Sequence, residues 1–123
     1  MTINDAIGRL GSLMQDTYSV QDKVRWLSEV DGKVKATIVD VHEDGGPGHC
    51  CQYDPDLDMD LELLVGPPFE EVYLRYLEAQ IHYHNEEYDR YDAAIALFER
   101  LLEEYRNWYH RRHRSKSVKI RYF

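Results

Sequence analysis

The stretch HCCQYDPDLDMD, residues 49–60, contains a histidine, two adjacent cysteines and four aspartates, which are residue types that bind metal ions. The carboxylates begin at Asp54 and alternate as in the first half of a calcium-binding loop. The sixth position, however, is Met59 where that loop needs glycine, and the twelfth is Val65 where a bidentate glutamate closes the site. The pattern therefore favours a solvated acidic loop over a calcium site.

A zinc site built from the nearby histidines and cysteines is also disfavoured. Two adjacent residues rarely direct both side chains at one ion, and the chain has no CxxC spacing. The ligands in question are His42, His49, Cys50 and Cys51. The other histidines, His82, His84, His110 and His113, are interpreted as surface or packing residues, and no metal or cofactor is expected.

Motifs for enzymatic chemistry are likewise missing from the sequence. It contains no glycine-rich phosphate loop, no nucleophile elbow and no HExxH pair. Carboxylates are plentiful, but nothing in their spacing fixes two of them in a pocket. The sequence therefore predicts a protein that is not an enzyme.

Size and charge indicate one globular domain with a basic end. The chain has 123 residues and a formal charge of −8. Residues 106–123 hold seven basic side chains and no acidic ones, which leaves −15 on the remainder. No stretch approaches the roughly 18 apolar residues of a membrane span. Because the N-terminus lacks the pattern of a secretion signal, we expect synthesis in the cytoplasm.

Apolar residues recur at helical spacing in four segments, which predicts helices over residues 3–14, 20–42, 68–84 and 86–112. Thr2 and Ser19 stand at the capping positions of the first two. A strand at ATIVDV is the competing interpretation within the second segment. The last helix carries three heptads of apolar positions and is about 40 Å long, so we expect part of it to project.

The segments between and after these helices differ from them in pattern. Residues 43–68 lack a sustained period and predict a long acidic loop. The final SVKIRYF alternates apolar and basic residues like a strand, which needs a sheet edge on another molecule. The expected fold class is all-α: a bundle of about four helices over residues 1–113, with the loop at 43–68, and an extended basic C-terminal arm over residues 114–123.

Two longer segments, DKVRWLSEVDGKV and the run from PPFEEVYLRYLEAQIHYHNEEYDRY to residue 114, resemble a known family. They are similar to small all-helical head-tail connectors, or head-completion adaptors, of tailed phages and prophages of Gram-positive hosts. The matching pieces are Trp26-Leu27 with Glu29, the PFEEVY entry into the third helix, the YLEAQI motif and the NEEYDRY motif. Together the two segments span about half of the chain.

The resemblance implies a structural protein of the virion, assembled in the host cytoplasm. Such proteins form a ring of about a dozen copies on the portal protein at the capsid vertex, next to other proteins of the head-tail junction. The genome DNA passes through the ring without specific binding, and no membrane is involved. A ring requires two different surfaces that meet head to tail, and an acidic body with a basic arm provides complementary surfaces.

The basic arm and the helix before it are the expected partner-binding site. Its arginines and lysines would pair with acidic groups, and its apolar residues would add a strand or an apolar plug. The residues are Trp108, Arg111, Arg112, Arg114, Lys116, Val118, Lys119, Ile120, Arg121 and Tyr122. The alternative is a small helical regulatory protein whose basic tail binds nucleic acid through its phosphates.

Overall fold

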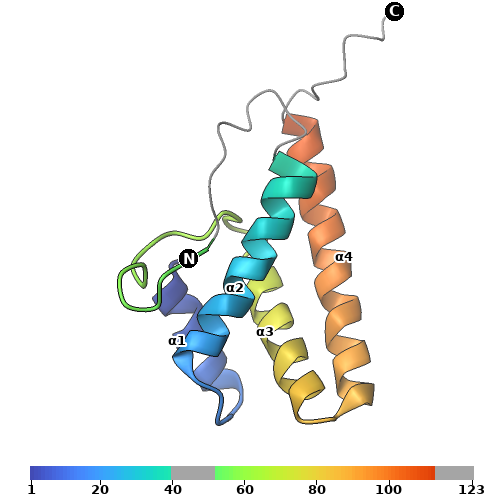
Figure 1. Cartoon of the computed structure of the whole chain (residues 1–123). Helices are drawn as coiled ribbons and strands as arrows, with labels where there is room; N and C mark the ends of the chain where they lie inside the picture. Colours follow the sequence, from blue (N-terminus) through green and yellow to red (C-terminus); the bar gives the residue numbers. More distant parts are fainter. Residues whose placement is uncertain (40–51, 113–123) are drawn as a thin grey trace, which may run out of the picture.

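The computed structural model describes residues 1–39 and 52–112, which form a bundle of four α-helices (Figure 1). The elements are α1 (Ile3–Leu13), α2 (Val20–Val34), the short π-helix η1 (Lys35–Val39), α3 (Glu71–His84) and α4 (Tyr88–Arg112). Residues 1–39 and 52–112 contain no strand, only an isolated bridge between Thr2 and Glu62. The all-α prediction is confirmed. The observed helix bounds differ from the predicted bounds by up to three residues, except at the end of α2, where the backbone changes to a π-helix.

The first two helices begin at the capping residues that the sequence indicates. The Asp5 amide donates to the Thr2 hydroxyl at 3.0 Å, and the Thr2 amide donates back to the Asp5 carboxylate at 3.2 Å. At α2 the Asp22 amide donates to the Ser19 hydroxyl at 3.1 Å. Each cap satisfies an amide that the first helical turn leaves without a partner.

The second predicted helix changes form before its expected end. From Lys35 to Val39 the backbone is a π-helix, in which each bond spans one residue more than in an α-helix. The Thr37 hydroxyl donates to the Lys33 carbonyl at 2.6 Å within this turn. Val34 and Ile38 are both buried, so the apolar face continues and a strand does not form up to residue 39. Residues 40–42 of the prediction lie outside the described residues.

Helices α3 and α4 form an antiparallel hairpin, with α2 lying against α3 and η1 reaching α4 (Figure 1). The buried side of α4 consists of Ala94, Phe98, Leu102, Tyr105 and Tyr109. We expected part of this helix to project beyond the body. Burial instead continues to within three residues of Arg112, so the described helix projects by less than one turn.

The described part of the acidic segment before α3 is largely exposed, as predicted, but backbone hydrogen bonds also attach it to the body. The Ile3 amide donates to the Leu61 carbonyl at 3.1 Å, and the Leu63 amide donates to the Met1 carbonyl at 3.0 Å. Leu63 and Val65 are buried. Asp54, Asp56, Leu57 and Asp60 are exposed, in agreement with a solvated loop.

A buried carboxylate on α2 joins this segment to two helices. Asp31 is fully buried. It accepts hydrogen bonds from the Tyr73 hydroxyl at 2.5 Å, from the Tyr53 hydroxyl at 2.6 Å and from the Leu64 amide at 3.1 Å. The Tyr73 hydroxyl in turn accepts from the Val65 amide at 2.7 Å. We call these residues the Asp31 network.

Burial is the main cause of the pKa shifts of Asp31 and Tyr73. Removal from water raises the pKa of Asp31 above its usual range, and the three hydrogen bonds offset that rise only in part. Burial also raises the pKa of Tyr73, and the neighbouring carboxylate adds to the effect. Tyr73 therefore remains a neutral phenol that donates its proton to Asp31.

The turn between α3 and α4 is built around one residue with a positive φ. Glu86 has φ of 64°, a left-handed conformation that favours glycine. The Glu87 amide donates to the His82 carbonyl at 2.8 Å, which is the six-residue closure typical of a helix C-terminus. The turn thus holds a glutamate in a glycine-like position.

Replacing Glu86 with glycine is expected to stabilise the fold by about 0.5–1 kcal/mol, because glycine adopts this φ without steric cost. The free energy of unfolding from urea denaturation measures the change. Glu86→Ala is the matched control, since it removes the carboxylate but keeps the side-chain carbon. An equal gain from both substitutions would show that backbone strain is not the cause.

Asp31→Asn is expected to lower the free energy of unfolding by about 1–3 kcal/mol, because an amide nitrogen replaces one acceptor oxygen. Since the pKa of Asp31 is raised in the fold, its protonated form is favoured there. Its contribution to stability is therefore fully present below the unfolded pKa of about 4 and is lost as pH rises through the folded value. The difference between wild type and variant should shrink as pH rises.

Urea denaturation of both proteins at a series of pH values tests this, with Asp92→Asn on the exposed face of α4 as the control. A difference that grows with pH would contradict the assignment, because it would mean that the fold favours the charged carboxylate.

Candidate partner-binding site

An aromatic cluster surrounds the C-terminal end of α4, where the sequence predicts partner contacts. We call Phe69, Tyr105, Trp108 and Tyr109 the aromatic cap. The Phe69 ring lies 5.5 Å from Tyr105 and 5.4 Å from Trp108, and Tyr105 lies 5.8 Å from Trp108 and from Tyr109. These separations are those of interacting ring pairs. The cap fixes the last turns of α4 to the segment before α3.

Positions of the cap rings follow from helical spacing and from a turn. Tyr105, Trp108 and Tyr109 are three and four residues apart and so share one side of α4. Phe69 is placed opposite them because its amide closes a turn onto the Gly66 carbonyl at 3.0 Å, two residues before α3 begins. Pro67 and Pro68 lie within this turn, which is why α3 starts at Glu71 and not at residue 68 as predicted.

The basic side chains of the site begin on the last turn of α4. The Arg112 guanidinium lies 4.9 Å from the centre of the Trp108 ring, a cation–π contact, and Arg111 is exposed. Cations at this position also interact favourably with the negative end of the helix dipole. Trp108 is half-buried between the other rings of the cap and Arg112, so its remaining exposed surface adjoins a positive charge.

Of the predicted partner-binding residues, the structure therefore brings Trp108 and Arg112 into contact and places Arg111 beside them on the surface. The remaining seven lie outside the described residues: Arg114, Lys116, Val118, Lys119, Ile120, Arg121 and Tyr122. Their role stays a prediction.

Burial also sets the ionisation state of the cap. It raises the pKa of Tyr105 to about 12, with smaller contributions from Tyr109 and Asp31. The phenol is therefore neutral at physiological pH, and the cap adds no negative charge that would neutralise Arg111 or Arg112. The site is an apolar aromatic surface with a positive rim.

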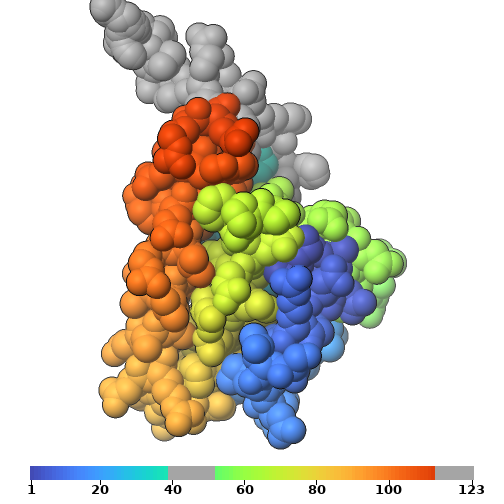
Figure 2. Space-filling view, turned by 180° about the vertical axis from the view of Figure 1, so that it is seen from behind, coloured from blue at the N-terminus to red at the C-terminus, as the bar shows by residue number. Residues whose placement is uncertain are grey.

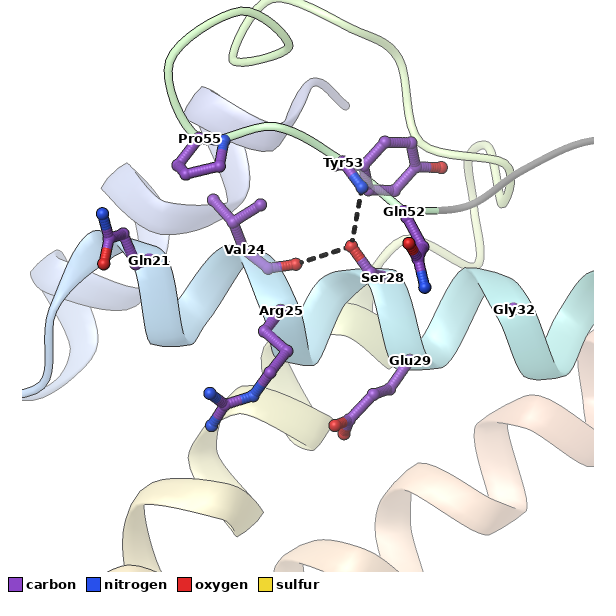
Figure 3. A pocket seen from close by; sticks show the side chains of 9 residues that line it. All are labelled: Gln21, Val24, Arg25, Ser28, Glu29, Gly32, Gln52, Tyr53 and Pro55. Carbon is purple, nitrogen blue, oxygen red and sulfur yellow. Dashed lines mark hydrogen bonds between the residues drawn. The ribbon is translucent and has the colours of Figure 1, made fainter.

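A second feature is an open groove between α2 and the start of the acidic segment (Figure 3). Its volume is about 740 Å³, and it is lined by Gln21, Val24, Arg25, Ser28, Glu29, Gly32, Gln52, Tyr53 and Pro55. The Ser28 hydroxyl donates to the Val24 carbonyl at 2.9 Å and accepts from the Tyr53 amide at 3.1 Å. This hydroxyl serves to attach the segment to α2, and among residues 1–39 and 52–112 the lining supplies no histidine that would activate it as a nucleophile.

Two of the predicted surface or packing histidines contact neighbouring side chains, His82 from a buried position and His84 from an exposed one. His82 is buried and its Nδ1 lies 2.8 Å from the Glu87 carboxylate, a contact that lowers the pKa of Glu87. The His84 ring stacks on Trp26 at 5.5 Å.

Within residues 1–39 and 52–112 no three potential ligands gather into a metal-binding group. No helix in this part of the chain has both the length and the apolar composition of a membrane span.

Sequence reasoning missed Phe69 and the Asp31 network. Phe69 was counted only as part of a helical stripe, and nothing in its spacing relates it to Trp108. For Asp31 a signal existed: it lies four residues after Leu27 and three before Val34, in phase with the apolar side of α2. A lone aspartate in such a position indicates a buried acceptor with partners elsewhere in the chain.

Comparisons with protein-family models, with curated proteins and with solved structures each found no match to this chain.

Phe69→Ala is expected to lower the free energy of unfolding by about 2–3 kcal/mol, because it removes the ring that Tyr105 and Trp108 pack against. Urea denaturation provides the measurement. Leu57→Ala is the control, since Leu57 is 81% exposed and its loss should cost less than about 0.5 kcal/mol. Similar effects of both substitutions would show that the cap does not hold the end of α4.

Proposed function

We propose that this chain is a structural head-tail connector of a tailed phage or prophage, and that its C-terminal end attaches it to the portal. The observation that carries the proposal is the resemblance of its second, third and fourth helices, in order and spacing, to that family. The proposal requires no catalysis, cofactor or metal.

Contacts between the resembling motifs support the proposal. The Tyr76 hydroxyl of the YLEAQI motif donates to the Glu29 carboxylate at 2.8 Å, and the ring of Trp26 stacks on His84, which directly precedes NEEYDRY. Motifs that are far apart in sequence thus form one contact set, as expected if they specify a common three-helix frame.

The charge distribution provides a second line of support. The last turn of α4 presents Arg111 and Arg112 beside the aromatic cap, and further basic residues follow in the sequence. Arginine and aromatic side chains are enriched among the residues that dominate protein interfaces. An acidic body would also keep passing DNA from adhering to the lumen of a ring.

In this proposal the residues of the arm make two kinds of contact. Arg111, Arg112, Arg114 and Lys116 pair with acidic groups of the portal or a neighbouring subunit, which gives orientation. Val118, Ile120 and Tyr122 alternate with Lys119 and Arg121, so they add a strand to a sheet edge or fill an apolar slot.

A chain ending at Arg112 is expected to fold like the full chain but to lose assembly with the portal protein encoded in the same genome. The physical reason is that the described body retains its core and cap, whereas the docking residues from Arg114 onward are removed. Circular dichroism with urea denaturation measures folding, and negative-stain imaging with co-sedimentation on portal rings measures assembly.

The matched control keeps the chain length and replaces Arg114 and Lys116 with glutamate, which reverses the charge without removing the apolar residues. Full assembly by the shortened chain would overturn the proposed docking role. Salt-dependent binding of duplex DNA without any association with portal would favour the nucleic-acid-binding alternative.

A further inference from the structure

The end of the bundle opposite the aromatic cap carries a second aromatic surface, which is exposed. Tyr83 lies 5.3 Å from Tyr91, 5.9 Å from Tyr88 and 5.4 Å from His84, measured between ring centres. Tyr83 and Tyr88 are 48% and 54% exposed. We call Tyr83, His84, Tyr88 and Tyr91 the tyrosine patch. Because His84, Tyr88 and Tyr91 each contact Tyr83, the patch is one surface and not scattered side chains.

The frame beneath the tyrosine patch is rigid. His84 stacks on the buried Trp26, and the Tyr18 hydroxyl bonds to Asn85 at 2.7 Å. These contacts attach the start of α2 to the turn between α3 and α4, and both lie at the same end of the molecule (Figure 1). Figure 2 shows the end of α3 and the start of α4 together at the surface there. A preformed patch binds a partner with little loss of side-chain freedom.

The charges around the patch are mostly negative. Glu86, Asp89 and Asp92 are exposed, and none of them makes an ion pair with another described residue; Arg90 is the basic neighbour. Asp92 lies one helical turn from Tyr88, on the same side of α4. Aromatic faces next to free carboxylates match the guanidinium group, which stacks on rings and pairs with carboxylates at its edge.

We infer that the tyrosine patch binds the basic end of α4, Arg111, Arg112 and Arg114, of a second copy of this chain. Those arginines begin the run of basic residues at the opposite end of the molecule, which complements the patch in charge and in chemistry. Arg114 itself lies outside the described residues.

The contact has to be between copies because of the length of α4. From Tyr88 to Arg112 the helix rises about 36 Å. Arg114 follows two residues later and extends the reach by at most about 7 Å. The arginines of one copy therefore do not reach its own patch. Two different surfaces meeting in this way form a head-to-tail contact, which continues into a closed ring or an open chain.

This contact goes beyond the proposed attachment to the portal and leaves Lys116 to Tyr122 available for it. It forms between copies of the chain alone, so it is tested without portal. The two sites share Arg114, so they are distinguished by readout: self-association of the full chain without portal tests this contact, and co-sedimentation on portal rings tests the attachment to the portal.

The test is a charge exchange between the two ends, measured by sedimentation equilibrium of the full chain from micromolar to millimolar concentration. One variant carries Asp89→Arg and Asp92→Arg, and the other carries Arg111→Glu and Arg114→Glu. Arg112 is left in place because it covers Trp108. Each variant alone places like charges at the contact positions and should associate at least tenfold more weakly than wild type. An equimolar mixture should associate like wild type, because every contact between unlike variants is again complementary.

Three further pairs of substitutions distinguish the effects of the tyrosine rings and of the local charge from the effect of net charge. Tyr83→Ala with Tyr88→Ala should weaken association about tenfold, whereas Tyr83→Phe with Tyr88→Phe should preserve it, because the ring faces remain. Asp56→Arg with Asp60→Arg makes the same charge change on the acidic segment and should have little effect.

Several results would overturn the inference. They are a wild-type chain that stays monomeric over the whole range, a mixture of the exchange variants that fails to associate, equal association of the alanine pair and wild type, or equal weakening by the control at Asp56 and Asp60.

Discussion

The fold depends on one buried carboxylate. Asp31 accepts from the two tyrosine hydroxyls and one amide that surround it, and these donors come from the acidic segment and from α3. Burying a carboxylate without a cation is costly, and hydrogen bonds offset that cost only when all of them form together. The network therefore selects one arrangement of α2, α3 and the segment between them. The buried Leu63 and Val65, and through them the position of the aromatic cap, follow from that arrangement.

Helices with strong periodicity were predictable, and the connections between them were not. The heptads of α4 and the caps at Thr2 and Ser19 are local patterns, so spacing alone locates them. The acidic segment reads as solvated because its aspartates dominate its composition. Its attachment instead depends on backbone bonds to residues 1–4 and on Asp31, which are distant in sequence and leave no local periodicity.

The same distinction applies to the binding surfaces. Trp108 and Arg112 were identified because a basic run follows an aromatic residue at the end of a helix. Phe69 completes that surface through a turn at Gly66 that no spacing rule relates to α4. The tyrosine patch likewise combines rings from both sides of the α3–α4 turn with a frame from the start of α2. An acidic aromatic end and a basic aromatic end on one helix bundle give the molecule a direction, as the proposed connector function requires.

The Asp31 network also has a consequence for the order of folding. The three hydrogen bonds to Asp31 join residues 22, 33 and 42 positions apart, whereas α3 and α4 are adjacent helices joined by a short turn. Loop closure opposes the distant contacts more than the local ones. The hairpin is therefore expected to form in the transition state, and the network to close after it. Kinetically, Phe98→Ala should slow folding, whereas Tyr53→Phe should mainly speed unfolding. The acidic segment would then be the last part of the body to reach its place and the first to leave it.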